Sequence, residues 1–266
     1  MQLVTREEEG RLVAGSHRSP SRPLVLGHRG ASADAPENTL AAFLLAMEQG
    51  ADGVELDVWR CGTGEVVVHH DPDTARTSGT ALRVSSASLG ALRRLDVGAW
   101  RGERFRGQRI PLLAEVLEAL PGAAVNVELK SVGLPDLELA RAVLRVLRDA
   151  GAEERCIVSS FDYTLLVALR LAGPTIAAGA LFAADSWWRV REMLATRLLR
   201  PRAVHPPSAL VTERSARDWA ARGLDVNAWA VDSPGQVERL CRLGVAAVIS
   251  DRPGRARAAV RQATGR

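Results

Sequence analysis

The sequence has little cysteine, few aromatic residues and almost no lysine. Three of the 266 residues are cysteine, 4% are aromatic, and lysine occurs once, at Lys130. Cys61, Cys156 and Cys241 lie far apart and form no Cys-x-x-Cys pair, which argues against a disulfide framework and against a zinc site. No apolar run approaches the ~18–20 residues that a membrane-spanning helix needs. We therefore expect a protein without a transmembrane segment, in which buried cysteines fill the core.

The charge balance is mildly basic, and arginine supplies nearly all of the positive charge. Lysine and arginine together number 35 against 31 acidic residues, for a net charge of +4. This balance favours an anionic substrate but gives no footprint of nucleic-acid binding. From Arg252 to Arg266 the chain carries five arginines and no acidic residue. We expect a basic C-terminal tail over 254–266, solvated or frayed, with an anionic partner as the alternative.

The N-terminal stretch MQLVTREEEGRLVAG contains three consecutive acidic residues. A secretory signal would need a basic start followed by ~7–15 apolar residues, and neither is present. We therefore interpret residues 1–23 as an N-terminal extension and predict a cytoplasmic location.

Short apolar runs rich in β-branched residues recur along the rest of the chain, as in strands buried on both faces. Helix-like segments that end near glycine or proline separate most of them. This alternation predicts a (β/α)8 TIM barrel over residues 24–253. An open doubly wound sheet is the alternative, but no Gly-x-Gly-x-x-Gly turn follows the first strand. The predicted strands are Leu24–Gly27, Gly53–Asp57, Ala124–Leu129, Cys156–Ser159, Ile176–Leu181, Arg202–His205, Asp225–Val231 and Ala246–Ser250.

One interval, between Asp57 and Ala124, is too long for a single connection in a barrel. It starts with the short strand pattern GEVVVHHD and continues as a polar, turn-rich stretch. Loops of this length in a compact domain are usually functional or disordered. We expect a small insertion, about residues 71–111, over the barrel mouth, with helices near Ser88–Leu95 and Leu112–Leu120.

Carboxylates stand in a repeated pattern on the second and third predicted barrel strands. Alternate residues of a strand share a face, so Glu55 and Asp57 lie together, as do Glu128 and Lys130. Burying neighbouring carboxylates costs several kcal/mol unless their charge is compensated. A divalent cation is the simplest compensation, and ion pairs with core arginines are the alternative. Oxygen ligands favour a hard cation such as Mg²⁺ or Ca²⁺.

Histidines and an arginine stand at the same predicted rim, where the active sites of such barrels lie. His28 and Arg29 follow the first strand, and His69 and His70 alternate so that one of them can point into the mouth. Imidazoles serve as acid and base near neutral pH, and arginine and lysine bind phosphate. Taken singly, each residue has a structural alternative, such as a capped turn histidine. Together they indicate metal-assisted phosphodiester cleavage.

Two further polar or aromatic candidates lie on later strands. His205, in VHPP, is more typical of a structural residue, and Trp229, in NAWAV, fits core packing as well as a substrate contact. Trp187 and Trp188 lie in a predicted helix, where core packing is favoured over a subunit contact. The sequence does not define an oligomeric state.

The motifs in their order along the chain resemble those of the glycerophosphodiester phosphodiesterase family. They are HRGASADAPENTLAAF, GADGVELDV, HDPDTART, NVELK, SFDYTLL, VNAWAV and ISDRP, spread from about Leu24 to Pro253. The resemblance implies a TIM barrel with a small insertion after strand two. In the family's second-strand turn, Thr-x-Asp-Gly is usual, whereas here CGTG places Cys61 and Thr63 at the first and third positions. We expect that turn to keep the hairpin that delivers His70.

The resemblance also implies roles for individual residues. These are an acid/base pair, His28 and His70; substrate contacts, Arg29, Lys130 and Trp229; and metal ligands, Glu55, Asp57 and Glu128. The cofactor would be one divalent cation, Mg²⁺ or Ca²⁺, with Mn²⁺ as an alternative. The function implied is metal-dependent hydrolysis of a small-molecule glycerophosphodiester to glycerol 3-phosphate and an alcohol.

Two other functions are compatible with the pattern. A related phosphodiesterase acting on a lysophospholipid or a sphingolipid would favour an apolar groove in the insertion, where TSGTALRVSSASLG is mostly polar. A non-catalytic barrel that binds a phospho-ligand would be expected to lack a carboxylate or a histidine of the set, and none is missing.

Overall fold

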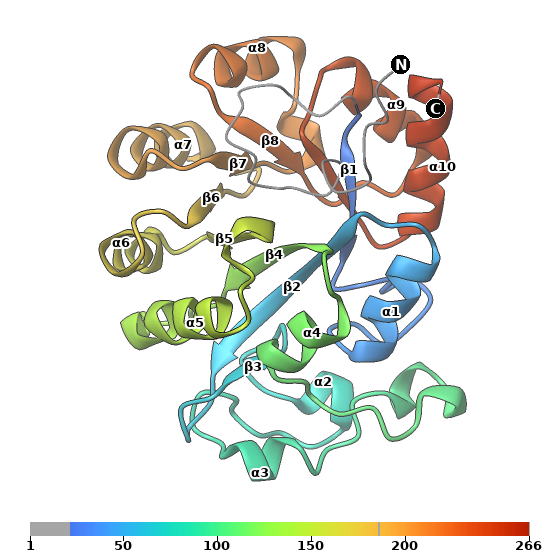
Figure 1. Ribbon diagram of the computed structural model, residues 1–266, viewed down its shortest axis with the longest axis vertical. Coiled ribbons are helices and arrows are strands. Elements are labelled where there is room, and N and C mark those ends of the chain that lie inside the picture. Colours follow the sequence, from blue (N-terminus) through green and yellow to red (C-terminus); the bar gives the residue numbers. More distant parts are fainter. Residues whose placement is uncertain (1–21, 186, 266) are drawn as a thin grey trace.

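The computed structural model describes residues 22–185 and 187–265. Its sheet has nine strands in the order β1-β9-β8-β7-β6-β5-β4-β2-β3, and pairing of β1 with β2 closes it. β3 runs antiparallel to β2 and the other neighbours are parallel, which confirms the predicted TIM barrel (Figure 1). The strands are β1 (Leu24–His28), β2 (Gly53–Arg60), β3 (Val66–Val68), β4 (Ala124–Leu129), β5 (Cys156–Ser160), β6 (Ala177–Leu181), β7 (Ala203–His205), β8 (Asp225–Ala228) and β9 (Ala247–Ser250).

Helices connect successive barrel strands and surround the sheet (Figure 1). Many begin at a side-chain cap; for example, Asp136 accepts from the backbone N–H of Glu138, and Asp162 from that of Thr164. The ring consists of α1 (Leu40–Glu48), α4 (Leu113–Ala119), α5 (Leu137–Asp149), α6 (Tyr163–Ala172), α7 (Trp188–Leu194), α8 (Glu213–Ala221), α9 (Pro234–Arg242) and α10 (Pro253–Thr264). A π-helical turn, Ala195–Leu199, continues α7, and 3₁₀ turns occupy Glu153–Arg155 and Ser208–Leu210.

Strand alternation separates an outer apolar layer from a polar barrel mouth. On β2, Val54, Leu56 and Val58 are buried in the cluster between the sheet and the helices. The residues between them, Glu55 and Asp57, occupy the opposite face, which looks into the barrel. A smaller apolar cluster fills the barrel below them and comprises Leu24, Leu26, Ala124, Ala247 and Ile249. The interior is therefore a packed apolar floor with charged groups at one end.

The insertion after β2 is a small subdomain with its own apolar cluster. It contains α2 (Ala75–Ser78), α3 (Leu89–Leu92) and 3₁₀ turns at Ala99–Arg101 and Glu103–Phe105. Arg101 donates to the carbonyl oxygens of Ser32 and Ala33, and Arg104 donates to that of Asp34. These contacts fasten the insertion to the loop that follows β1. The cluster comprises Trp59, Cys61, Val67, Val84, Leu92, Val97 and Ile110.

The helices expected in the insertion differ from those observed. The helix expected near Ser88–Leu95 is one turn, Leu89–Leu92, which Ser88 caps; it ends there because the backbone N–H groups of Arg94 and Leu95 donate to carbonyl oxygens three residues back instead of four. The helix expected near Leu112–Leu120 is α4, which buries Leu113, Val116 and Leu117 in the main core. It therefore belongs to the barrel ring and not to the insertion.

The C-terminal segment is not the frayed tail expected from its arginines. Pro253–Thr264 forms α10, in which Pro253, Ala256, Ala259 and Val260 are buried. Small and apolar residues at helical spacing pack on the barrel, while the arginines between them face outward or form ion pairs, as Arg257 does with Asp52. The prediction of a frayed end was wrong because it relied on the arginine content and overlooked the helical spacing of the small and apolar residues.

At the other end, residues 1–21 of the expected extension, 1–23, lie outside the described residues. Arg22 forms an ion pair with Asp52 at 2.8 Å, directly before β1. No helix in the described part of the chain combines the length and the apolar character needed to cross a membrane.

Candidate functional site

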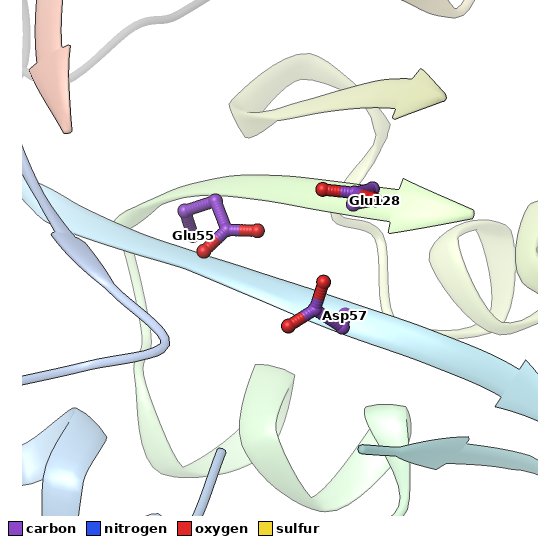
Figure 2. Close-up of side chains that lie close together, drawn as sticks. All are labelled: Glu55, Asp57 and Glu128. Carbon is purple, nitrogen blue, oxygen red and sulfur yellow. The ribbon is translucent and has the colours of Figure 1, made fainter. Parts of the chain in front are cut away.

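Three carboxylates meet where β2 and β4 lie side by side. The strand register pairs Asp57 with Glu128 and places Glu55 opposite Asn126, so the inward side chains become neighbours. One ligand oxygen from each of Glu55, Asp57 and Glu128 lies within 4.8 Å of the others, and all three residues are buried. Figure 2 shows the three carboxyl groups directed toward a common space between the two strands. This is the donor set that a hard divalent cation prefers.

The cluster holds more negative charge than its protein neighbours compensate. Lys130 Nζ lies 2.8 Å from Glu128 Oε1 and 3.3 Å from Asp57 Oδ1, and Arg29 Nε lies 3.4 Å from Asp57 Oδ2. Burial favours the neutral form of Asp57, but these two cations outweigh it and lower its pKa. Burial and the charge of Asp57 raise the pKa of Glu55 to about 8, and the same two causes raise that of Glu128. The neighbouring cations thus stabilise the charged form of Asp57 only. A divalent cation would compensate the charge of Glu55 and Glu128.

His28 ends β1 beside this cluster and is held through one ring nitrogen. Its Nδ1 lies 2.6 Å from Asp251 Oδ1, and its Nε2 lies 4.0 Å from Glu55 Oε2. The hydroxyl of Ser32 donates to Asp251, and the Asp251 backbone N–H donates to Asp232. Burial lowers the pKa of His28, but the bond to Asp251 and the charge of Glu55 together raise it above its ordinary value. The other ring nitrogen, Nε2, remains available for acid–base chemistry.

His70 repeats this arrangement on the other side. Its Nδ1 lies 2.7 Å from Asp71 Oδ1, and Arg76 Nε donates to the other Asp71 oxygen at 2.6 Å. Burial lowers the pKa of His70, although the charge of Asp57 opposes the shift. His69 is turned away, buried, with Nε2 3.0 Å from the carbonyl oxygen of Asp73. The alternation of the two histidines therefore places one at the cavity and the other in the insertion.

Arg29 is fixed by a chain of ion pairs that reaches the insertion. Its Nη1 donates to Glu37 Oε1 at 2.9 Å, and both Glu37 oxygens accept from Arg76, at 2.7 and 2.8 Å. The side-chain amide of Asn38 donates to Asp57 at 2.8 Å. Burial disfavours the charged form of Glu37, but the two arginines outweigh it and lower its pKa. Glu37 is thus part of the site rather than a surface residue.

Two glycines shape the turn that carries His28 and Arg29. Gly30 has φ +85°, and a Cβ there would lie 2.5 Å from the carbonyl carbon of Ala42. A Cβ on Gly27 would lie 2.8 Å from the Gly30 carbonyl oxygen. Only glycine fits these two positions without displacing backbone, and the tight turn directs both functional side chains to the mouth.

A cavity of about 240 Å³ joins these groups and has two unlike walls. On one wall lie His28, Arg29, Glu55, His70, Asn126, Glu128 and Lys130, and on the other Phe161, Leu181, Trp229, Ala230 and Ile249. Trp229 donates from Nε1 to the His205 carbonyl oxygen at 2.8 Å and meets Phe161 edge-on, with ring centroids 5.8 Å apart. His205 itself is fully buried, 3.0 Å from the amide of Asn227, as expected of a structural residue.

The unusual CGTG turn keeps the hairpin closed. The Cys61 backbone N–H donates to the Glu65 carbonyl oxygen at 2.9 Å, and the Thr63 hydroxyl and the Cys61 thiol both donate to the Glu65 carboxylate. The Glu65 carboxylate thus binds both Cys61 and Thr63 across the turn.

Sequence reasoning missed several residues that orient the site. Asp251 and Asp71 hold the two imidazoles, and Arg76 and Asn38 hold Glu37 and Asp57. Each of them lies inside a motif that had been singled out, in ISDRP, HDPDTART and APENT. Their position within these motifs was therefore the signal in the sequence, because the spacing of the residues gives no chemical reason to select them. Trp187 is 64% exposed and therefore does not pack in the core as expected, and the side chain of Trp188 lies outside the described residues.

Comparison with known proteins agrees with this geometry. The model of the glycerophosphoryl diester phosphodiesterase family matches residues 28–255. The glycerophosphodiester phosphodiesterase of Caldanaerobacter subterraneus subsp. tengcongensis is 35% identical over 239 residues, which cover 87% of this chain and 95% of that protein. A phosphodiesterase of Oleispira antarctica, solved in complex with the product sn-glycerol-3-phosphate, matches with a TM-score of 0.81 at 32% identity, covering 90% of this chain and 97% of that one.

A glycerophosphodiester phosphodiesterase from Thermotoga maritima matches with a TM-score of 0.71 at 30% identity, over 87% of this chain and 96% of that one. Family, relatives and solved structures therefore agree over nearly the whole barrel. The chain belongs to the glycerophosphoryl diester phosphodiesterase family and is an enzyme of that family.

Proposed function

We propose that this enzyme hydrolyses small glycerophosphodiesters to glycerol 3-phosphate and an alcohol in the cavity at the barrel mouth. The observation that carries the proposal is the placement of two imidazoles, each held at Nδ1 by a carboxylate, around one buried carboxylate cluster. The product bound to the Oleispira antarctica relative, sn-glycerol-3-phosphate, matches the product proposed for this enzyme.

Glu55, Asp57 and Glu128 are the residues that would hold the cation, Mg²⁺ or Ca²⁺, with Mn²⁺ as the alternative. Once bound, such an ion would polarise a phosphoryl oxygen and neutralise developing charge. Arg29 and Lys130 then face the phosphate as donors, and the contacts of Arg29 with Glu37 keep its guanidinium from rotating away. Trp229 would lie against the substrate from the apolar wall.

The two imidazoles move the protons. The hydroxyl at C2 of the glycerol attacks phosphorus, so that an O–P bond forms and the bond from phosphorus to the alcohol oxygen breaks. One imidazole Nε2 accepts the hydroxyl proton, and the other donates its proton to the leaving alcohol. We assign His28 as base and His70 as acid; the reverse is the alternative, and the raised pKa of His28 and the lowered pKa of His70 support that alternative. Water then opens the cyclic phosphate with the roles exchanged; direct attack by water is the other route.

The direct experiment measures hydrolysis of glycerophosphocholine and glycerophosphoethanolamine with each cation, and with a chelator as control. We expect an alcohol and glycerol 3-phosphate in stoichiometric amounts with at least one cation, and none with chelator. Tight binding of the diester without turnover under every cation would instead make the protein a binding barrel. The complete set of carboxylates and imidazoles supports the enzyme over that alternative. The cytoplasmic location stays a prediction of the N-terminal sequence.

A further inference from the structure

Arg76 lies in the insertion after β2, outside the set of residues that line the catalytic cavity. Local bonds hold the single turn of α2 that carries it. The buried Thr74 donates from Oγ1 to the carbonyl oxygen of Thr80 at 2.6 Å, and the same Oγ1 accepts from the backbone N–H of Leu82 at 3.2 Å. Thr77, the next residue, is also buried. The exposed side chain of Arg76 therefore extends from a fixed piece of backbone.

The guanidinium of Arg76 divides its donors between two carboxylates. Its Nε donates to Asp71 at 2.6 Å, and its Nη1 and Nη2 donate to the two oxygens of Glu37 at 2.7 and 2.8 Å. The other Asp71 oxygen lies 2.7 Å from Nδ1 of His70. Glu37 also accepts from Nη1 of Arg29 at 2.9 Å. One planar group thus joins the carboxylate that holds an imidazole to the carboxylate that holds the arginine proposed to bind phosphate.

These contacts keep both carboxylates charged and held from two sides. Partial burial disfavours the charged form of Asp71, but the bonds from Arg76 and His70 outweigh it and lower its pKa to about 2. Burial acts in the same sense on Glu37, and its two arginine partners lower its pKa as well. Each carboxylate accepts from Arg76 and from one group of the cavity, so neither can turn without breaking an ion pair.

We propose that Arg76 is a positioning residue of the reaction, because its one guanidinium orients both His70 and Arg29 through the carboxylates between them. This inference rests on the proposed function and adds a residue of the insertion to it. A carboxylate that is fixed on its far side keeps an imidazole in one orientation and one tautomer. Lysine would be a poor replacement, because an ammonium lacks the planar fork that meets two carboxylates at once. The insertion then takes part in catalysis and does more than cover the barrel mouth.

The test measures hydrolysis of glycerophosphocholine by Arg76→Gln and Arg76→Lys. We expect kcat of Arg76→Gln to fall by about 10 to 10², as for other residues that orient a functional group, with KM within about threefold of the wild type. Arg76→Lys should stay within about threefold of Arg76→Gln, whereas a role that needs only positive charge would be rescued by lysine. Arg76→Lys also keeps the test open if Arg76→Gln destabilises the insertion.

Arg93→Gln is the matched control. Arg93 is likewise an arginine of the insertion, is partly exposed and pairs with Glu115 on α4 at 2.5 Å, so its loss also removes an ion pair between the insertion and the barrel ring. Arg93 does not line the cavity and contacts neither Asp71 nor Glu37. We therefore expect wild-type kinetics from this variant.

Two double variants separate positioning from a purely structural role. In the background of His70→Ala, Arg76→Gln should lower kcat by no more than about threefold further, because the imidazole that it orients is gone. In the background of Glu37→Gln the further loss should likewise be smaller than in the wild type, because the link to Arg29 is already broken. Losses that multiply in either background would overturn the proposal.

The remaining outcomes separate this inference from the proposed function. Unchanged kcat in Arg76→Gln, full rescue by Arg76→Lys, or an equal loss in Arg93→Gln would each overturn the role of Arg76 while the wild type still hydrolyses glycerophosphocholine. Absence of hydrolysis by the wild type with any cation would overturn the proposed function and this inference together.

Discussion

The two walls of the catalytic cavity are built by different forces. On the charged wall, contributed mainly by the ends of β1, β2 and β4, His28, Arg29 and Lys130 each have at least one ion-pair partner within 3 Å. The apolar wall is held by packing, by an edge-on contact between Phe161 and Trp229, and by one bond from Trp229 to the backbone. The charged wall is thus set up for chemistry and the apolar wall for binding.

This contrast predicts a division of kinetic effects. Changes on the charged wall should act on kcat, because its groups stabilise charge that develops in the transition state. Changes on the apolar wall should act on KM, because its contacts are made equally by bound substrate and transition state.

The largest effect is expected for Glu55→Gln. Loss of this carboxylate should remove cation-dependent turnover, with a fall of about 10³ or more in kcat, a loss of several kcal/mol of transition-state stabilisation. Because burial and Asp57 raise the pKa of Glu55, the free carboxylate opposes folding, so the variant should melt above the wild type in chelator. Thermal unfolding with and without cation measures this. A variant that melts lower in chelator would contradict the picture of uncompensated charge.

The next effect is expected for His28→Ala and His70→Ala, each lowering kcat by about 10² or more. Substrates with a choline and with a nitrophenol leaving group separate the roles. If His70 is the acid, His70→Ala should lose much less on the nitrophenyl ester, whose leaving group needs no proton, whereas His28→Ala should lose equally on both. Losses of kcat below tenfold in both variants would show that neither imidazole acts as the catalytic acid or base.

These predictions start from residues that the sequence alone could identify, and the reason is physical. Alternation along β2 and β4 fixes the faces of Glu55, Asp57 and Glu128 once the strands are recognised, and the parallel register then brings them together. The barrel followed from the same apolar runs. Asp251 could not be found in this way, because its contact with His28 joins residues at opposite ends of the chain. The helix α10 was missed because its alanines gave a weaker signal than its arginines.

Asp251→Asn tests that missed contact and should have an intermediate effect. The amide can still bond to His28 Nδ1, but as a donor it would favour the wrong tautomer and would not stabilise an imidazolium. We expect kcat to fall by about 10 to 10² with KM nearly unchanged. A change in KM alone, or in thermal stability alone, would show that Asp251 supports the loop and does not position the imidazole.

The smallest effect is expected on the apolar wall. Phe161→Ala removes the edge-on partner of Trp229 and should raise KM for glycerophosphocholine about threefold to tenfold, with kcat within about twofold of the wild type. Steady-state kinetics measure both constants. A fall in kcat as large as that of the histidine variants would contradict the claim that the apolar wall acts on KM and the charged wall on kcat.

The central claim is that one divalent cation binds among Glu55, Asp57 and Glu128 and that turnover depends on it. The most direct measurement is calorimetric titration of Mg²⁺, Ca²⁺ and Mn²⁺ into the chelator-treated protein, repeated with Glu128→Gln. We predict binding of one ion per chain for at least one of the three cations and its loss in the variant. Full turnover of glycerophosphocholine by protein that binds none of them, or binding left unchanged by Glu128→Gln, would contradict the account.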